Sequence, residues 1–105
     1  MLTANIYSDD KVIVSGFYDC DEYNLIMDLG GEPAEILKYM QATFVKGYIS
    51  GRNDAAAKID GKLADLKDKD DFIINEINSW CKDTIGTSFS DTGNAAISIY
   101  RKLLD

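Results

Sequence analysis

From residue 19 to the end of the chain, apolar residues recur mostly at intervals of three and four, the spacing of one face of an α-helix. Capping residues and glycines divide this stretch into segments. We predict five helices: from Asp19, Asp21 or Glu22 to Leu29, closed by Gly30 and Gly31; from Pro33 to Gly51; over 53–67; from Asp70 or Asp71 towards Gly86; and from Ser90 or Asp91 to the end.

The same spacing predicts which side of each helix faces a core. The helix after Pro33 is expected to bury the stripe Ile36, Leu37, Met40, Phe44 and Tyr48. The short first helix is expected to pack through Leu25, Ile26 and Leu29, and the last two through Ile73, Ile77, Trp80 and Cys81 and through Ala95, Ile99 and Leu103. The segment 53–67 has a narrow stripe, which predicts a peripheral helix.

The first 18 residues have a different pattern. Residues 2–7 alternate between apolar and polar, residues 12–18 are β-branched and aromatic, and the polar segment 8–11 lies between them, which predicts a β-hairpin. Gly16 indicates a bulge or a close approach by another element. We therefore expect an α+β fold in one domain, 1–105, with an N-terminal β-hairpin (1–18) packed on a bundle of four to five helices (19–105).

The C-terminal segment leaves one alternative open. Residues 95–101 could add a third antiparallel strand beside the hairpin. Helix is favoured, because Tyr100 to Leu104 continue the helical period.

The net charge of −7 arises entirely in the first third of the chain. Residues 1–35 hold eight acids and one base, Lys11, whereas the acids and bases of residues 36–105 balance. Turns and helix starts explain many of these acids, but not the near absence of bases among them. We expect an acidic partner-binding face made of Asp9, Asp10, Asp19, Asp21, Glu22, Asp28, Glu32 and Glu35, with the aromatic side chain of Tyr23 as an anchor.

An acidic face is attracted to basic surfaces and repelled by nucleic acid and anionic membrane. We therefore expect a protein that binds and inhibits a partner with a basic surface, such as a nucleic-acid-binding protein or nuclease. In composition this is similar to phage anti-defence and anti-CRISPR proteins and to toxin-immunity proteins. The alternatives are an assembly protein that forms homo-oligomers, and a small-ligand sponge that uses Lys38, Lys46, Arg52 or Arg101. Monomer and homodimer both stay open.

The sequence lacks the residues that several kinds of catalytic and metal-binding site require. Without histidine, the commonest general base and metal ligand is missing, and we expect no enzyme, no cofactor and no metal. Asp91-Thr92-Gly93 is interpreted as a helix start rather than a protease motif. Cys20 and Cys81 match no metal spacing, so two free thiols are expected, with one disulfide as the alternative. With no signal peptide or membrane span, the expected location is the cytoplasm of a bacterium or of a phage-infected host.

Overall fold

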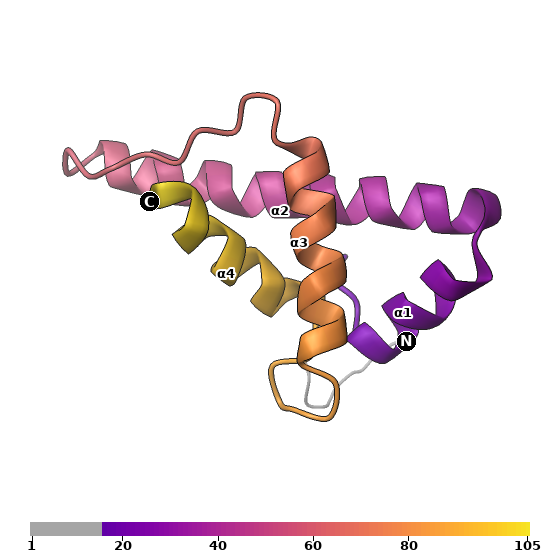
Figure 1. The fold of residues 1–105 in the computed structure, drawn as a ribbon. Helices are drawn as coiled ribbons and strands as arrows, with labels where there is room; N and C mark the ends of the chain where they lie inside the picture. Colours follow the sequence, from indigo (N-terminus) through magenta and orange to yellow (C-terminus); the bar gives the residue numbers. More distant parts are fainter. Residues whose placement is uncertain (1–15) are drawn as a thin grey trace, which may run out of the picture.

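The computed structural model describes residues 16–105, and these fold into four α-helices (Figure 1). The helices are α1 (Cys20–Leu29), α2 (Gly31–Ala57), α3 (Asp70–Asp83) and α4 (Thr92–Leu104). The long helix α2 contacts the other three, and α3 crosses it, with α1 on one side of the crossing and α4 on the other. α3 therefore lies between α1 and α4, which contact each other weakly along their lengths but are joined at their caps by the Asp19–Asp91 backbone bridge.

The expectation of an α+β fold is wrong for the described residues, because residues 16–105 contain helices and no strand. Most of the predicted hairpin, residues 1–15, lies outside the described part. The end of its second strand, residues 16–18, forms a turn and irregular chain instead. Residues 95–101 lie within α4, which confirms the favoured helix for the C-terminal segment and contradicts the alternative of a third strand.

Local capping signals placed the starts of α1 and α4 correctly, whereas α2 begins at Gly31 rather than Pro33, and Lys69, not Asp70 or Asp71, is the cap residue of α3. The Asp19 carboxylate accepts a hydrogen bond from the Asp21 N–H at 3.1 Å and begins α1. The Asp91 carboxylate accepts from the Asn94 N–H at 2.7 Å and begins α4, so the Asp-Thr-Gly tripeptide is a helix start. Gly30, with a φ of 70°, ends α1 as predicted.

Helix α2 is longer than predicted, because it continues through Gly51 to Ala57. The Arg52 guanidinium lies 4.8 Å from the ring centroid of Tyr100 on α4, and donates a hydrogen bond of 3.1 Å to the Tyr48 hydroxyl. These contacts offset the roughly 1 kcal/mol that a glycine costs inside a helix.

The predicted helix over 53–67 is also wrong, since residues 58–69 form an irregular connection. The Asn53 side chain pins this connection to α2 by hydrogen bonds to both the N–H and the carbonyl of Ala64, at 2.8 and 2.9 Å. Ile59 is 80% exposed and Leu63 is 53% exposed. Of the predicted apolar stripe only Leu66 packs against the core, and with so little burial a short helix is marginal.

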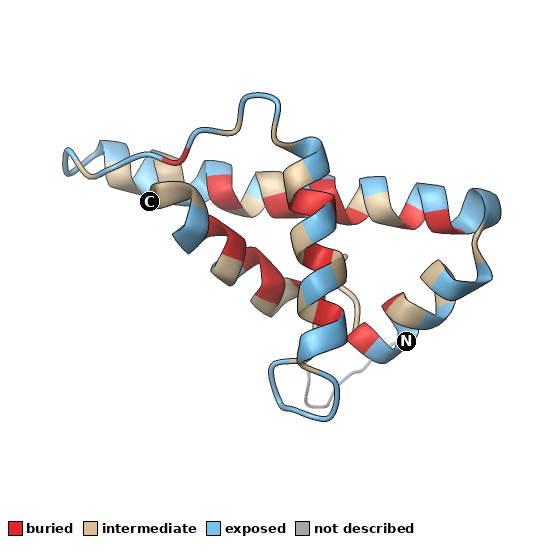
Figure 2. Ribbon diagram, in the orientation of Figure 1, coloured by how far each residue is buried: buried red, intermediate tan, exposed pale blue. Residues whose placement is uncertain are grey.

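The core lies where α2, α3 and α4 meet and along the first half of α1 (Figure 2). On α2 the buried residues are Ala34, Leu37, Gln41, Ala42, Val45 and Ile49. Ile36 and Phe44, expected in the core, are instead exposed. The Phe44 ring packs over Gly16, where a Cβ atom would lie 2.6 Å from it. The predicted close approach at Gly16 is thus confirmed, and its φ of +104° also favours glycine.

The two cysteines form a disulfide, so the expectation of free thiols is wrong and the alternative is confirmed. Cys20 is the first residue of α1, and Cys81 lies in the last turn of α3. Their Cα atoms are 5.0 Å apart across a sequence separation of 61 residues, and neither side chain is exposed. The bond ties α1 to α3 inside the core.

A buried hydrogen-bond network joins the start of the described chain to α2 and α4. The Thr92 hydroxyl donates to Gln41 Oε1 and accepts from the Tyr18 N–H at 2.8 Å. Gln41 Nε2 donates to the Gly16 carbonyl at 2.6 Å, and the Thr92 N–H donates to the Tyr18 carbonyl at 2.8 Å. Gln41 and Thr92 are both fully buried, so their polar atoms need these partners.

Candidate protein-binding surface

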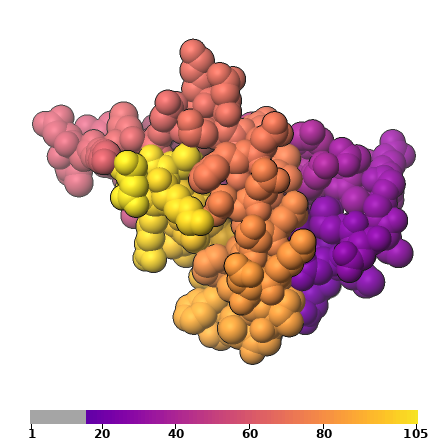
Figure 3. Space-filling model, viewed as in Figure 1, coloured from indigo at the N-terminus to yellow at the C-terminus, as the bar shows by residue number. Residues whose placement is uncertain are grey.

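The side chains of α1 lie on two sides of the helix, one buried against the core and one exposed. Cys20 and Tyr23 are fully buried, and Ile26 and Met27 are partly buried against the core. The exposed residues recur at the spacing of one helix face, and we call them the α1 outer face: Asp21, Glu22, Leu25, Asp28 and Leu29. α1 lies at the edge of the molecule, next to the first turns of α2 (Figure 3). Within residues 16–105, these side chains are therefore accessible to a partner.

The charge of the α1 outer face is uniformly negative, because α1 contains three carboxylates and no lysine or arginine. Asp21 and Glu22 lie in the first turn, where negative charge stabilises the helix dipole by about 0.3–1 kcal/mol each. Asp28 lies in the last turn, where the dipole disfavours a carboxylate. The stability of α1 therefore accounts for two of these acids but not for Asp28.

Two leucines lie among these carboxylates. Leu25 is 61% exposed and Leu29 is 78% exposed, and their spacing of four places them on the same side of the helix. The sequence pattern had assigned both to the core. Cys20, Tyr23 and Met27 form a second apolar stripe at spacings of three and four, and this stripe faces inward instead. Recognising that competing stripe would have shown that the leucines need not face the core.

The structure brings together part of the predicted acidic face. Asp21, Glu22 and Asp28 share the α1 outer face, whereas Asp9 and Asp10 lie outside the described residues. Asp19 is half-buried as the cap of α1 and pairs with Asp91 through a backbone bridge. Glu32 and Glu35 are exposed on the first turns of α2, beyond the turn that ends α1. The exposed acids thus extend from α1, past the turn at Gly30, to the first turns of α2.

Tyr23 is a core residue, and its expected role as a surface anchor is wrong. Its side chain is fully buried, and its hydroxyl donates a 2.7 Å hydrogen bond to Asn78 Oδ1 on α3. Burial raises the pKa of this hydroxyl to about 12, because the phenolate would be poorly solvated there.

The raised pKa predicts a loss of stability at high pH. A tyrosine in the unfolded chain loses its proton near pH 10, while folded Tyr23 holds its proton until about pH 12. The free energy of unfolding should therefore be unaffected by Tyr23 well below pH 10. It should fall by up to about 2 kcal/mol as the pH rises towards 12, because only the unfolded chain then loses this proton. Urea unfolding at pH 9, 10 and 11 checks this. The decline should be shallower in Tyr23→Phe, and equal slopes would contradict the assignment.

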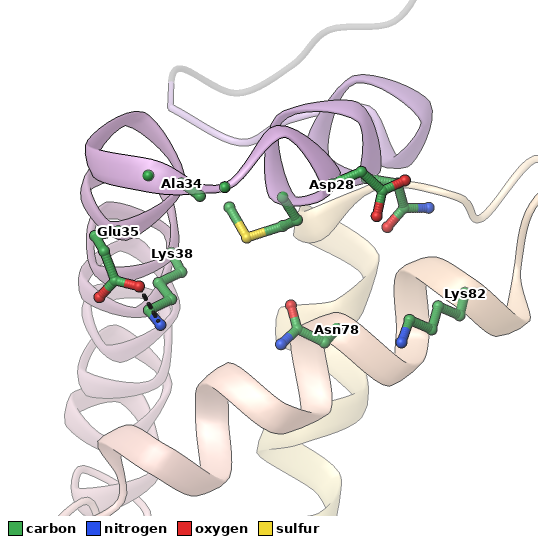
Figure 4. A pocket seen from close by; sticks show the side chains of 10 residues that line it. Asp28, Ala34, Glu35, Lys38, Asn78 and Lys82 are labelled. Carbon is green, nitrogen blue, oxygen red and sulfur yellow. Dashed lines mark ion pairs between the residues drawn. The ribbon is translucent and has the colours of Figure 1, made fainter.

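A cleft of about 300 Å³ lies beside Asp28, between the α1–α2 turn and α3 (Figure 4). Its lining mixes both signs of charge: Asn24, Met27, Asp28, Gly30, Gly31, Ala34, Glu35, Lys38, Asn78 and Lys82. Lys38 Nζ is 2.8 Å from Glu35 Oε2, and the hydrogen bond to this carboxylate raises the pKa of Lys38. Two carboxylates face two ammonium groups here, so the cleft has no excess of either charge.

The bases expected for a small-ligand site do not converge. Lys38 lines the cleft, but Lys46 pairs with Asp70 at 2.8 Å, and Arg52 stacks on Tyr100. Among residues 16–105, no group of three or more potential metal-ligating side chains comes together. The same part of the chain contains no helix long and apolar enough to cross a membrane.

Comparison with protein-family models, with curated proteins and with solved structures gave no match to this chain. The function proposed below is therefore derived from the residues of the α1 outer face and their surroundings.

Proposed function

We propose that this chain is a small inhibitor that binds a basic surface of a partner protein through the α1 outer face. The observation that carries the proposal is the placement of two exposed leucines among three carboxylates on a helix without a base. Where this basic surface normally holds nucleic acid, the bound inhibitor would occupy the place of phosphate groups.

The two residue types would contribute differently to binding. Burying a leucine side chain stabilises a complex by about 1.5–3 kcal/mol, so Leu25 and Leu29 would slow dissociation. The carboxylates would speed association with a positively charged partner, and this effect would weaken as salt rises. The buried disulfide and the Tyr23–Asn78 hydrogen bond hold α1 in place beneath the face.

We keep two sequence expectations as parts of this proposal. The protein acts by occupying a surface rather than by catalysis. It acts in the cytoplasm of a bacterium or a phage-infected host, where nucleases and other nucleic-acid-binding proteins are found.

Charge reversal on the α1 outer face tests the proposal. The variant Glu22→Lys/Asp28→Lys should associate with the partner at least about tenfold more slowly at low salt, and the difference should shrink at high salt. Asp54→Lys/Asp105→Lys is the matched control, because it makes the same change in net charge at exposed positions outside α1. The control should retain most of the wild-type rate.

The partner is first captured from bacterial lysate on immobilised wild-type protein, and is then purified for stopped-flow or surface-plasmon measurements. Leu25→Ala/Leu29→Ala should mainly raise the dissociation rate. A captured protein that binds both charge variants equally well, and also binds the leucine variant unchanged, would refute docking through this face.

Self-association is a second candidate function, favoured by the exposure of Ile59 and Leu63 on the connection 58–69. A second copy could cover these side chains. Light scattering after gel filtration decides this directly, since a monomeric mass across a hundredfold range of concentration would exclude it.

A further inference from the structure

We propose that the Cys20–Cys81 disulfide is a redox-sensitive lock on the α1 outer face, so that the face is ordered in the oxidised protein and loosened in the reduced one. This inference rests on the proposed function, because it assigns a regulation to the same surface. It does not require the partner to be known, since the order of α1 can be measured in the free protein.

Helix α1 depends on its tertiary contacts. It has ten residues, and isolated helices shorter than about 12–15 residues are marginal in water. Its two fully buried side chains, Cys20 and Tyr23, both lie in its first half. In its second half, Ile26 and Met27 are only partly buried against the core, and the exposed leucines add little packing. The attachment of α1 to the bundle is therefore concentrated at its beginning, where the disulfide lies.

Three links hold this half of α1 to one short stretch of α3. The Cys20–Cys81 bond is covalent, the Tyr23 hydroxyl donates to Asn78, and Asn24 Nδ2 donates to the Cys81 carbonyl at 3.0 Å. After reduction, these two hydrogen bonds and the one from the Cys20 N–H to the Ser90 carbonyl, at 3.0 Å, still hold this end of α1, and each typically contributes only about 0.5–1.5 kcal/mol. Loss of the disulfide should therefore loosen α1 before the helices it packs against.

The chemistry is thiol–disulfide exchange with a cellular dithiol. A thiolate of the dithiol attacks one cysteine sulfur, the S–S bond breaks, and a mixed disulfide forms. The second thiol of the dithiol then displaces this cysteine. The two cysteines gain two electrons and two protons in total, and the dithiol becomes a disulfide. The reducing cytoplasm maintains such dithiols, and disulfides found there are usually transient or redox-sensing.

The burial of the bond determines how the lock opens. Both cysteines are 0% exposed, so a reductant reaches a sulfur atom only when this end of α1 opens transiently. Once reduced, two neutral thiols are compatible with the apolar core, because free cysteine behaves as a small hydrophobe. The reduced protein should therefore keep α2, α3 and α4 together and remain able to re-form the bond.

Hydrogen exchange measured by mass spectrometry tests the lock in the free, full-length protein. The amides of α1 are compared with those in the later turns of α4, away from the Asp19–Asp91 bridge that joins the starts of the two helices. When dithiothreitol reduces the wild-type protein, the ratio of α1 to α4 exchange rates should rise at least about tenfold. Cys20→Ala/Cys81→Ala should show the same high ratio without reductant, and reoxidation of the wild type should restore the low ratio.

Three results would overturn the lock: an unchanged ratio, equal acceleration in both helices, or a bond that dithiothreitol leaves intact in the folded protein. If the double-alanine variant does not fold, reduction and reoxidation of the wild type decide the question. Because no partner is present, such a failure leaves docking through the α1 outer face standing. Conversely, equal binding by the charge and leucine variants would refute the docking without affecting the exchange ratio.

Discussion

Removing the Cys20–Cys81 disulfide is expected to lower the free energy of unfolding by about 4 kcal/mol. The bond closes a loop of 61 residues, and cross-linking a loop of this length restricts the unfolded chain by roughly that amount. A chain of 105 residues has about 5–15 kcal/mol of total stability, so the reduced protein should remain folded with a much smaller margin.

Urea unfolding with and without dithiothreitol measures this contribution. The wild type should lose about 4 kcal/mol on reduction, whereas Cys20→Ala/Cys81→Ala should have the lower stability in both conditions and not respond to reductant. A loss of less than about 1 kcal/mol in the wild type would show that the bond constrains the unfolded chain far less than its loop length implies.

The disulfide also illustrates the limit of inference from sequence. The sequence separation of Cys20 and Cys81 states nothing about their distance in space, so the sequence favoured free thiols and left the disulfide as an alternative that only the structure could establish. Helix ends, by contrast, depend on neighbouring residues. The caps Asp19 and Asp91 and the glycine Gly30 act within one turn, and all three were among the residues that the sequence offered for these positions.

Helix faces were harder to predict than helix ends. Along α2 the large apolar residues Ile36 and Phe44 indicated the wrong side, because the buried stripe includes Gln41 and small residues such as Ala34. Gln41 is accommodated in the core through the Gly16 carbonyl and the Thr92 hydroxyl. These partners come from distant parts of the chain, so no local pattern reveals them.

At the candidate site, too, the helix has two apolar stripes, and the sequence does not show which one is buried. The acids of α1 were correctly expected to be accessible, since a carboxylate is rarely buried unpaired. The sequence predicted Tyr23 at the surface and Leu25 in the core, whereas the structure buries Tyr23 and exposes Leu25. Periodicity identifies apolar stripes but not which of two stripes meets the rest of the protein. For α1, the disulfide to Cys81 and the hydrogen bond to Asn78, both on α3, fix which side of the helix faces inward.

The buried network around Thr92 gives the second large expected effect. Thr92→Val keeps the size and shape of the side chain but removes the hydroxyl, which leaves the Tyr18 N–H and Gln41 Oε1 without this partner. An unsatisfied buried polar group costs about 1–3 kcal/mol, so the variant should lose about 2–4 kcal/mol.

Thr92→Ser is the matched control for this prediction, because it keeps the hydroxyl and removes one buried methyl group. It should lose only about 1 kcal/mol. Urea unfolding of the wild type and both variants at neutral pH separates the two contributions. Because the network holds residues 16–18 against α2 and α4, Thr92→Val should also speed hydrogen exchange at Tyr18 more than Thr92→Ser does. Equal losses of stability in the two variants would show that the hydroxyl contributes little, and that packing of the methyl group is what Thr92 supplies.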